Sequence, residues 1–113
     1  MIPLNCQLTV AELIALVRKD EERTGSFCVY GTGDSSNANL DSTCYICAHP
    51  EITVDYEEIF PAFVVQNSIE LWYRDELIQD VFDNALHQNP DVSDETIVDA
   101  IKHYNARDCF LDL

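Results

Sequence analysis

Apolar residues recur with the period of an α-helix in two segments near the C-terminal end of the chain. The first begins near residue 75 and ends at Asn89-Pro90, because the residue before a proline avoids helical backbone angles. The second begins at Ser93 or Asp94, both good N-cap residues. The short connection between the segments predicts an antiparallel helix pair. The apolar positions are Leu77, Ile78, Val81, Phe82, Ala85 and Leu86 in the first helix and Ile97, Val98, Ile101 and Tyr104 in the second.

The pattern nearer the N-terminus predicts one more helix and three strands. Thr9 and Glu12 have the spacing of a capping box, which predicts a helix from there to about Arg23. Residues 26–30, 43–48 and 69–74 are rich in β-forming residues, and the first two are expected to pair around the polar loop between them. The predicted fold is α+β: a single acidic domain, residues 1–113, with a small antiparallel sheet of about three or four strands packed by an N-terminal helix and a C-terminal antiparallel helix pair.

The chain carries 21 acidic and 6 basic residues, a net charge of −15 and a pI of about 4.1. Such a protein repels nucleic acid and anionic membranes and attracts basic partners, although acidity also serves solubility alone. A folded chain of this mass exposes about 6,000 Å². Spread evenly, the charge would amount to about one negative charge per 400 Å². A standard interface, with about 800 Å² on each partner, would then hold only about two negative charges. A docking face for a cationic protein must therefore hold clustered carboxylates.

Two acidic groups are candidate partner-binding sites. The segment 51–58 combines carboxylates with an amphipathic ring, which suits an interface, although a solvated connector has the same composition. In the predicted helix that begins near residue 75, three carboxylates recur at i, i+4 and i+7 with no base among them, at a small cost in helix stability. The candidates are Asp55, Tyr56, Glu57 and Glu58 in the segment and, as second choice, Glu76, Asp80 and Asp83 on the helix.

Pro61, in the apolar run 59–65 that follows the segment, argues for a loop, bulge or edge position rather than a central strand. The sole tryptophan, Trp72, is expected in the core rather than at an interface.

The loop 31–39 contains two glycines but lacks the remainder of either phosphate-binding fingerprint. This loop therefore does not predict a nucleotide-binding site.

The only metal-like cluster comprises Cys44 and Cys47, with His49 and a possible contribution from Cys28. In an extended strand, residues 44 and 47 point to opposite faces, so both cannot reach one ion without a turn. Core cysteines are the favoured interpretation, and zinc or redox chemistry are the alternatives. Because His87 and His103 share no local motif with a serine or cysteine, and no other catalytic signature is present, we expect a protein that is not an enzyme, with no catalytic residues, metal or cofactor.

The expected location is the cytoplasm. No apolar run approaches the roughly 20 residues that span a bilayer, and the N-terminus lacks the basic and apolar regions of a signal peptide. Five cysteines is an odd number for a disulfide framework, which favours reduced thiols.

The C-terminal block resembles the ending of a family of small bacterial proteins that are similar to immunity proteins of contact-dependent growth inhibition and related polymorphic toxin systems. The resemblance covers about the last 40 residues, and the region 31–63 departs from it. The matching stretches are DELIQDV (75–81), NAL (84–86), QNP (88–90), DE (94–95), AI (100–101), HY (103–104) and DCF (108–110).

The resemblance implies one-to-one binding of a cationic toxin domain, a nuclease, whose basic active-site cleft the acidic protein occludes. Its carboxylates would take the places of phosphates. The alternative is a nucleic-acid-mimicking regulator that sequesters a DNA- or RNA-binding protein. Neither hypothesis requires direct contact with nucleic acid or membrane.

Overall fold

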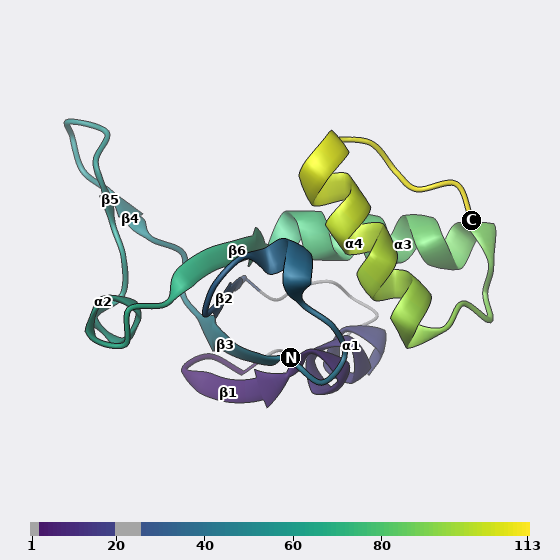
Figure 1. Cartoon of the computed structure of the whole chain (residues 1–113). Coiled ribbons are helices and arrows are strands. Elements are labelled where there is room, and N and C mark those ends of the chain that lie inside the picture. The colour runs from purple at the N-terminus through teal and green to yellow at the C-terminus, as the bar shows by residue number, and fades with distance from the viewer. Residues whose placement is uncertain (1–2, 20–25) are drawn as a thin grey trace.

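A four-stranded antiparallel sheet with the spatial order β1-β3-β2-β6 forms the centre of the computed structural model, which describes residues 3–19 and 26–113 (Figure 1). Helices α1, α3 and α4 pack their apolar faces against one side of this sheet. The predicted α+β architecture, with its N-terminal helix and C-terminal helix pair, is confirmed. The elements are β1 (Cys6–Thr9), β2 (Cys28–Gly31), β3 (Thr43–Cys47), β6 (Glu70–Arg74), α1 (Val10–Lys19), α3 (Asp75–Gln88) and α4 (Asp94–Arg107).

The helix starts follow the predicted capping chemistry. The Thr9 amide donates to Glu12 Oε1 at 3.1 Å, and the Glu12 amide donates to Thr9 Oγ1 at 3.2 Å, so the capping box of α1 is confirmed. Ser93 rather than Asp94 caps α4, since its Oγ accepts from the Thr96 amide. The expected continuation of α1 towards Arg23 lies outside the described residues. Across the described ranges, every helix falls short of the length and apolar character that a bilayer crossing requires.

The two faces of the sheet carry different clusters because side chains alternate along each strand. Val29, Cys44 and Ile46 face the helices and belong to the main core. Tyr30 and Cys47 face the other way, into a second, smaller core. This second core is closed by Phe60, by Val64 of the short helix α2 (Ala62–Gln66), and by Ile69.

A bulge in β6 places two large aromatic side chains in succession on the helix-facing side. Val29 pairs with Tyr73 but Tyr30 pairs with Leu71, so Trp72 is the extra residue. The Trp72 ring lies against Gly31, where an added Cβ would overlap the ring atoms. Trp72 Nε1 also donates to the Gly33 carbonyl at 3.1 Å. The predicted core role of Trp72 is thereby confirmed.

Three elements are absent from the sequence-based prediction. The first is β1, which pairs with β3 at one edge of the sheet. The second is a separate hairpin made of β4 (Glu51–Ile52) and β5 (Glu58–Ile59). The third is α2, which begins directly after Pro61, where a loop, bulge or edge position was expected. Proline suits the position before a helix because its fixed φ and missing N–H cost nothing there.

The loop between β2 and β3 is held to the body of the protein by its own polar groups. Asp34 Oδ1 accepts from the Ser36 amide at 2.9 Å and so caps the short 3-10 helix η1 (Ser35–Asn37). This hydrogen bond lowers the pKa of Asp34, because it favours the ionised carboxylate. The Lys102 Nζ of α4 donates to the Ala38 carbonyl at 3.0 Å. The loop therefore has structural contacts along its length.

Candidate partner-binding surface

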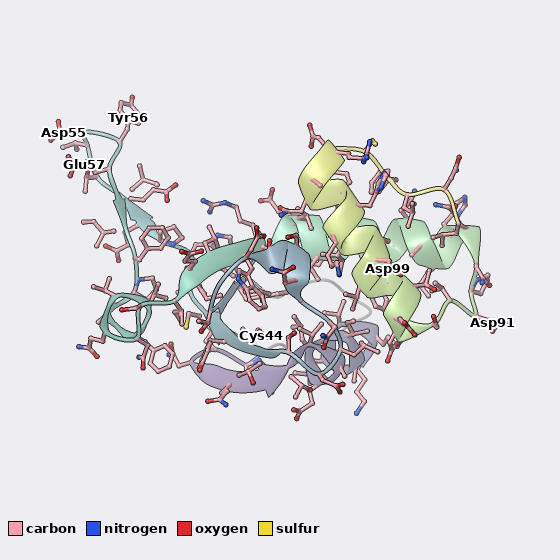
Figure 2. All side chains as sticks on the ribbon, in the orientation of Figure 1. Cys44, Asp55, Tyr56, Glu57, Asp91 and Asp99 are labelled. Atoms are coloured by element: carbon pink, nitrogen blue, oxygen red, sulfur yellow. The ribbon has the colours of Figure 1, made fainter. Side chains whose placement is uncertain are left out.

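The β4–β5 hairpin projects from the sheet, away from the helix pair (Figure 1). Its ladder is short: Glu51 pairs with Ile59, and Ile52 pairs with Glu58. Figure 2 shows Asp55, Tyr56 and Glu57 at its tip, pointing away from the body of the protein. The sequence-predicted segment 51–58 is thus an antiparallel hairpin, and three of its four candidate residues lie where a partner would meet them first.

The turn at the tip is closed by three hydrogen bonds that involve Thr53, and it contains a strained residue. The Tyr56 amide donates to the Thr53 carbonyl at 3.0 Å, and the Thr53 amide donates to the Glu57 carbonyl at 2.9 Å. Thr53 Oγ1 accepts from the Glu57 amide at 3.1 Å. This closure holds Tyr56 at a φ of 62°, in the left-handed region. Such a backbone costs a non-glycine residue about 1–2 kcal/mol. Strain of this kind often marks a functional position.

The tip exposes apolar area beside its carboxylates. Val54 is 95% exposed and Tyr56 is 87% exposed. Of the nine large apolar side chains that are exposed in the described residues, six lie in the hairpin and α2. Exposed apolar side chains concentrated in one part of a chain, with carboxylates beside them, are typical of a protein-binding site. The six are Ile52, Val54, Tyr56, Ile59, Phe63 and Val65.

Glu58 differs from the other three candidates because it lies at the base of the hairpin. Its Oε1 is 3.4 Å from Arg74 Nη2, the last residue of β6. Both side chains are more than two-fifths exposed, so this ion pair contributes at most about 1 kcal/mol. Glu58 therefore orients the hairpin against the sheet, whereas Asp55 and Glu57 remain at the tip.

The second candidate group lies on α3, and all three carboxylates are exposed. Glu76 and Asp80 border an open groove of about 390 Å³ between β6, α3 and α4. Tyr104 of α4 lines the same groove. Asp83 lies one turn further along the helix and does not line it. The structure thus joins two members of the predicted stripe to a concave surface and separates the third from it.

Acidic side chains lie at both ends of the molecule. Figure 2 places Asp55 and Glu57 on the hairpin, and Asp91 and Asp99 on the opposite side, beside the helix pair. These four positions show that carboxylates are not confined to one face of the molecule. The hairpin differs from the helix-pair end in combining its carboxylates with exposed apolar side chains, rather than in charge alone.

The cysteine cluster is divided by the sheet. Cys44 lies in the main core and Cys47 in the second core, so the two side chains face opposite sides as strand alternation predicts. Burial raises the pKa of the Cys44 thiol from its ordinary value of 9.0 to about 12. Within residues 3–19 and 26–113, no group of three or more His, Cys, Asp or Glu side chains is arranged to hold a metal ion.

Sequence reasoning named Cys28 and His49 in the metal-like cluster but missed Asp75 as a member of their group. Cys28 Sγ lies 3.2 Å from His49 Nδ1, and His49 Nε2 lies 3.1 Å from Asp75 Oδ1. The three residues come from β2, from the segment after β3, and from the first turn of α3. Asp75 lies 26 positions after His49 and shares no local motif with it, which is why sequence reasoning overlooked its place in the group.

The family model described as Domain of unknown function (DUF7716) matches residues 10–113. The chain belongs to this family. The matched region includes the hairpin as well as the three long helices, so the projecting hairpin lies within the family's domain. No curated protein and no solved structure matches the chain.

Proposed function

We propose that this member of the family is a cytoplasmic immunity protein that binds a cationic bacterial toxin domain, a nuclease, one-to-one and occludes its basic active-site cleft. The observation that carries the proposal is the hairpin tip, where Asp55 and Glu57 flank the exposed ring of Tyr56. The protein itself performs no reaction in this role.

The chemistry of the tip suits a basic cleft. Carboxylates form charge-assisted hydrogen bonds with arginine and lysine, and so can replace the phosphates of a nucleic acid. A tyrosine ring adds a large apolar contact at low cost in side-chain entropy, and tyrosine is enriched among residues that dominate binding energy. The strain at Tyr56 supports the same interpretation, because glycine or asparagine would form this turn without it.

The shape of the hairpin suits insertion. A two-stranded projection enters a cleft that a flat surface would only cover. The acidic groove beside Glu76 and Asp80 offers a second contact on the body of the protein, with Asp83 beyond it. Opposite charges on the partners would also steer association and increase its rate at low salt.

The test compares two variants with identical changes in net charge. Asp55→Asn with Glu57→Gln removes two charges from the hairpin tip, and Asp91→Asn with Asp99→Asn removes two from the opposite end, where both side chains are exposed. Association with purified nuclease toxin domains, beginning with any encoded beside the gene for this protein, is measured by stopped-flow at several salt concentrations. We expect the tip variant to associate about tenfold more slowly and to protect less against the toxin, and the control to resemble the wild type.

Equal effects of the two variants would contradict the proposed role of the hairpin, because they would show that only total charge matters. Failure of the wild type to bind or inhibit the toxin would contradict the proposed function itself. Binding to a host DNA- or RNA-binding protein in place of a toxin would support the nucleic-acid-mimicking regulator.

A further inference from the structure

Asp75 is the one charged residue in the described part of the chain that is buried, with 8% of its surface exposed. Its Oδ1 accepts from the Glu76 amide at 2.9 Å and lies 3.1 Å from His49 Nε2. Its Oδ2 accepts from the Phe27 amide at 3.4 Å. The carboxylate is thus held by groups from the first turn of α3, from the residue before β2 and from the segment after β3, and it orients the His49 ring.

This contact determines the role of each nitrogen of the ring. Facing a carboxylate, Nε2 of His49 carries the proton, which leaves Nδ1 as the acceptor. Nδ1 lies 3.2 Å from Cys28 Sγ, within reach of the thiol proton. A thiol, an imidazole and a carboxylate in this order form the arrangement of a base-activated nucleophile, which is recognised by geometry rather than by sequence position.

A second thiol lies beside the first. Cys28 and Cys47 are directly opposite each other in the β2–β3 ladder, and both belong to the second core. Directly opposite residues of an antiparallel pair have Cα atoms about 4.5–5.5 Å apart. A disulfide spans Cα separations of about 4.4–6.8 Å. The strands therefore need not separate or slide for the two sulfur atoms to bond.

We propose that Cys28 and Cys47 form a redox pair that hydrogen peroxide converts to a cross-strand disulfide, with the His49–Asp75 pair as the base for Cys28. This device is separate from partner binding, and no partner is needed to test it.

The reaction occurs in two steps that balance. In the first, the thiol proton of Cys28 moves to His49 Nδ1 as the sulfur attacks one peroxide oxygen. The O–O bond breaks, and the departing hydroxide takes the proton from His49 and leaves as water, so that Cys28 becomes a sulfenic acid. In the second, the Cys47 sulfur attacks the Cys28 sulfur, its S–O bond breaks, and a second water leaves with the Cys47 proton. Two thiols lose two electrons in total, and one peroxide gains them.

Burial of both thiols determines the class of oxidant. Neither Cys28 nor Cys47 exposes any surface, so a bulky disulfide cannot reach either sulfur atom. Hydrogen peroxide is little larger than water. His49 borders a hollow of about 310 Å³ at the base of the hairpin, lined also by Phe60 and Pro61, so a small molecule can reach the His49 side of the group, although neither thiol lines the hollow.

The charged and titratable groups around Cys28 determine how the reaction should depend on pH. The pKa of the Cys28 thiol is raised from 9.0 to about 11. Burial is the main cause, Arg74 and the Tyr30 hydroxyl act against it, and Asp75 and Cys47 act with it. At neutral pH the thiol is therefore protonated, and thiolate formation depends on the neighbouring base.

The first experiment exposes the purified full-length chain to hydrogen peroxide, blocks the remaining thiols, unfolds and digests the protein, and identifies linked peptides by mass spectrometry. We expect a Cys28–Cys47 disulfide. In Cys47→Ser, dimedone added as the oxidised protein is unfolded should label Cys28 as the sulfenic acid instead. Cys44 is an internal control, since it is equally buried but lies in the main core, on the other face of the sheet. Absence of the linked peptide, or oxidation of Cys44 as fast as Cys28, would overturn the proposal.

The second experiment separates a base from a structural residue. His49→Gln should slow the oxidation of Cys28 by roughly 10²-fold near neutral pH. Its rate should then rise about tenfold per pH unit, since only the thiolate of a thiol with a raised pKa reacts, whereas the wild-type rate should rise less steeply. An unchanged circular dichroism spectrum shows that the variant is folded. An identical rate and pH dependence in wild type and His49→Gln would overturn the role of the His49–Asp75 pair.

Discussion

The hairpin and the helix-pair end are both acidic, but they use their apolar residues in opposite ways. In α3 and α4, side chains such as Phe82 and Ile97 are almost fully buried in the main core. In the hairpin, Val54 and Tyr56 are almost fully exposed, and none of residues 51–59 belongs to either apolar cluster. One end therefore stabilises the fold, whereas the other presents apolar surface to solvent. Charge alone does not distinguish them.

The largest expected difference between the two ends is in stability. Phe82→Ala removes a ring that is 1% exposed and that stacks beneath the Arg18 guanidinium, 5.4 Å from the ring centroid. We expect the free energy of unfolding in urea to fall by about 3–5 kcal/mol. For comparison, Val54→Ala truncates an exposed apolar side chain of the hairpin, and its free energy of unfolding should stay within about 0.5 kcal/mol of that of the wild type. A comparable loss in both variants would show that the hairpin contributes to the cooperative core.

A smaller effect should appear at high pH and should arise in the sheet. Burial raises the pKa of Cys28 to about 11 and that of Cys44 to about 12, from an ordinary 9.0. Below pH 9.0 the thiols are protonated in both the folded and the unfolded state, and above it the unfolded state loses protons first. Stability should therefore fall as pH rises from about 9 to 12, with buried Tyr73 contributing in the same direction.

Urea unfolding at several alkaline pH values measures this loss, with the slope against pH as the readout. Cys44→Ala should make the slope shallower, whereas Cys109→Ala, at an exposed position, should not change it. Equal slopes in the wild type and Cys44→Ala would show that the buried thiol does not contribute.

The smallest expected change in stability is at the hairpin tip. Tyr56→Gly relieves the left-handed strain but increases the freedom of the unfolded chain, so the free energy of unfolding should change by no more than about 1 kcal/mol. The same variant should weaken toxin binding by about 2 kcal/mol or more, roughly 30-fold in Kd. Calorimetric titration and urea unfolding of one preparation provide both values. Unchanged affinity would remove Tyr56 from the interface.

The architecture was predictable where local chemistry alone determines it. The capping box at Thr9 and Glu12, the proline after Asn89 and the apolar faces of the last two helices each depend on neighbours within a few residues. The strand β1 was missed because it has only four residues, two of them the polar Gln7 and Thr9, and four residues are too few to show a period. Its position is determined by pairing with β3, far away in the sequence.

The candidate sites likewise combine features that the local sequence indicates with features that depend on distant contacts. The composition of the segment 51–58 indicated an interface, but its projection from the sheet depends on the turn that Thr53 closes and on the Glu58–Arg74 contact. Cys28 and His49 were named together only as possible metal ligands, and the place of Asp75 beside His49 was not predictable, because the fold brings together residues 21 and 26 positions apart along the chain. Contacts of this kind depend on tertiary structure, and a single sequence does not record them.

The absence of hairpin residues from both cores has an evolutionary consequence. Core packing does not restrict which residues can occupy the tip. Selection for a different partner can therefore change the tip residues while the remainder of the domain still folds. Transplanting the tip residues of one family member onto another should accordingly transfer recognition without redesign of the interior.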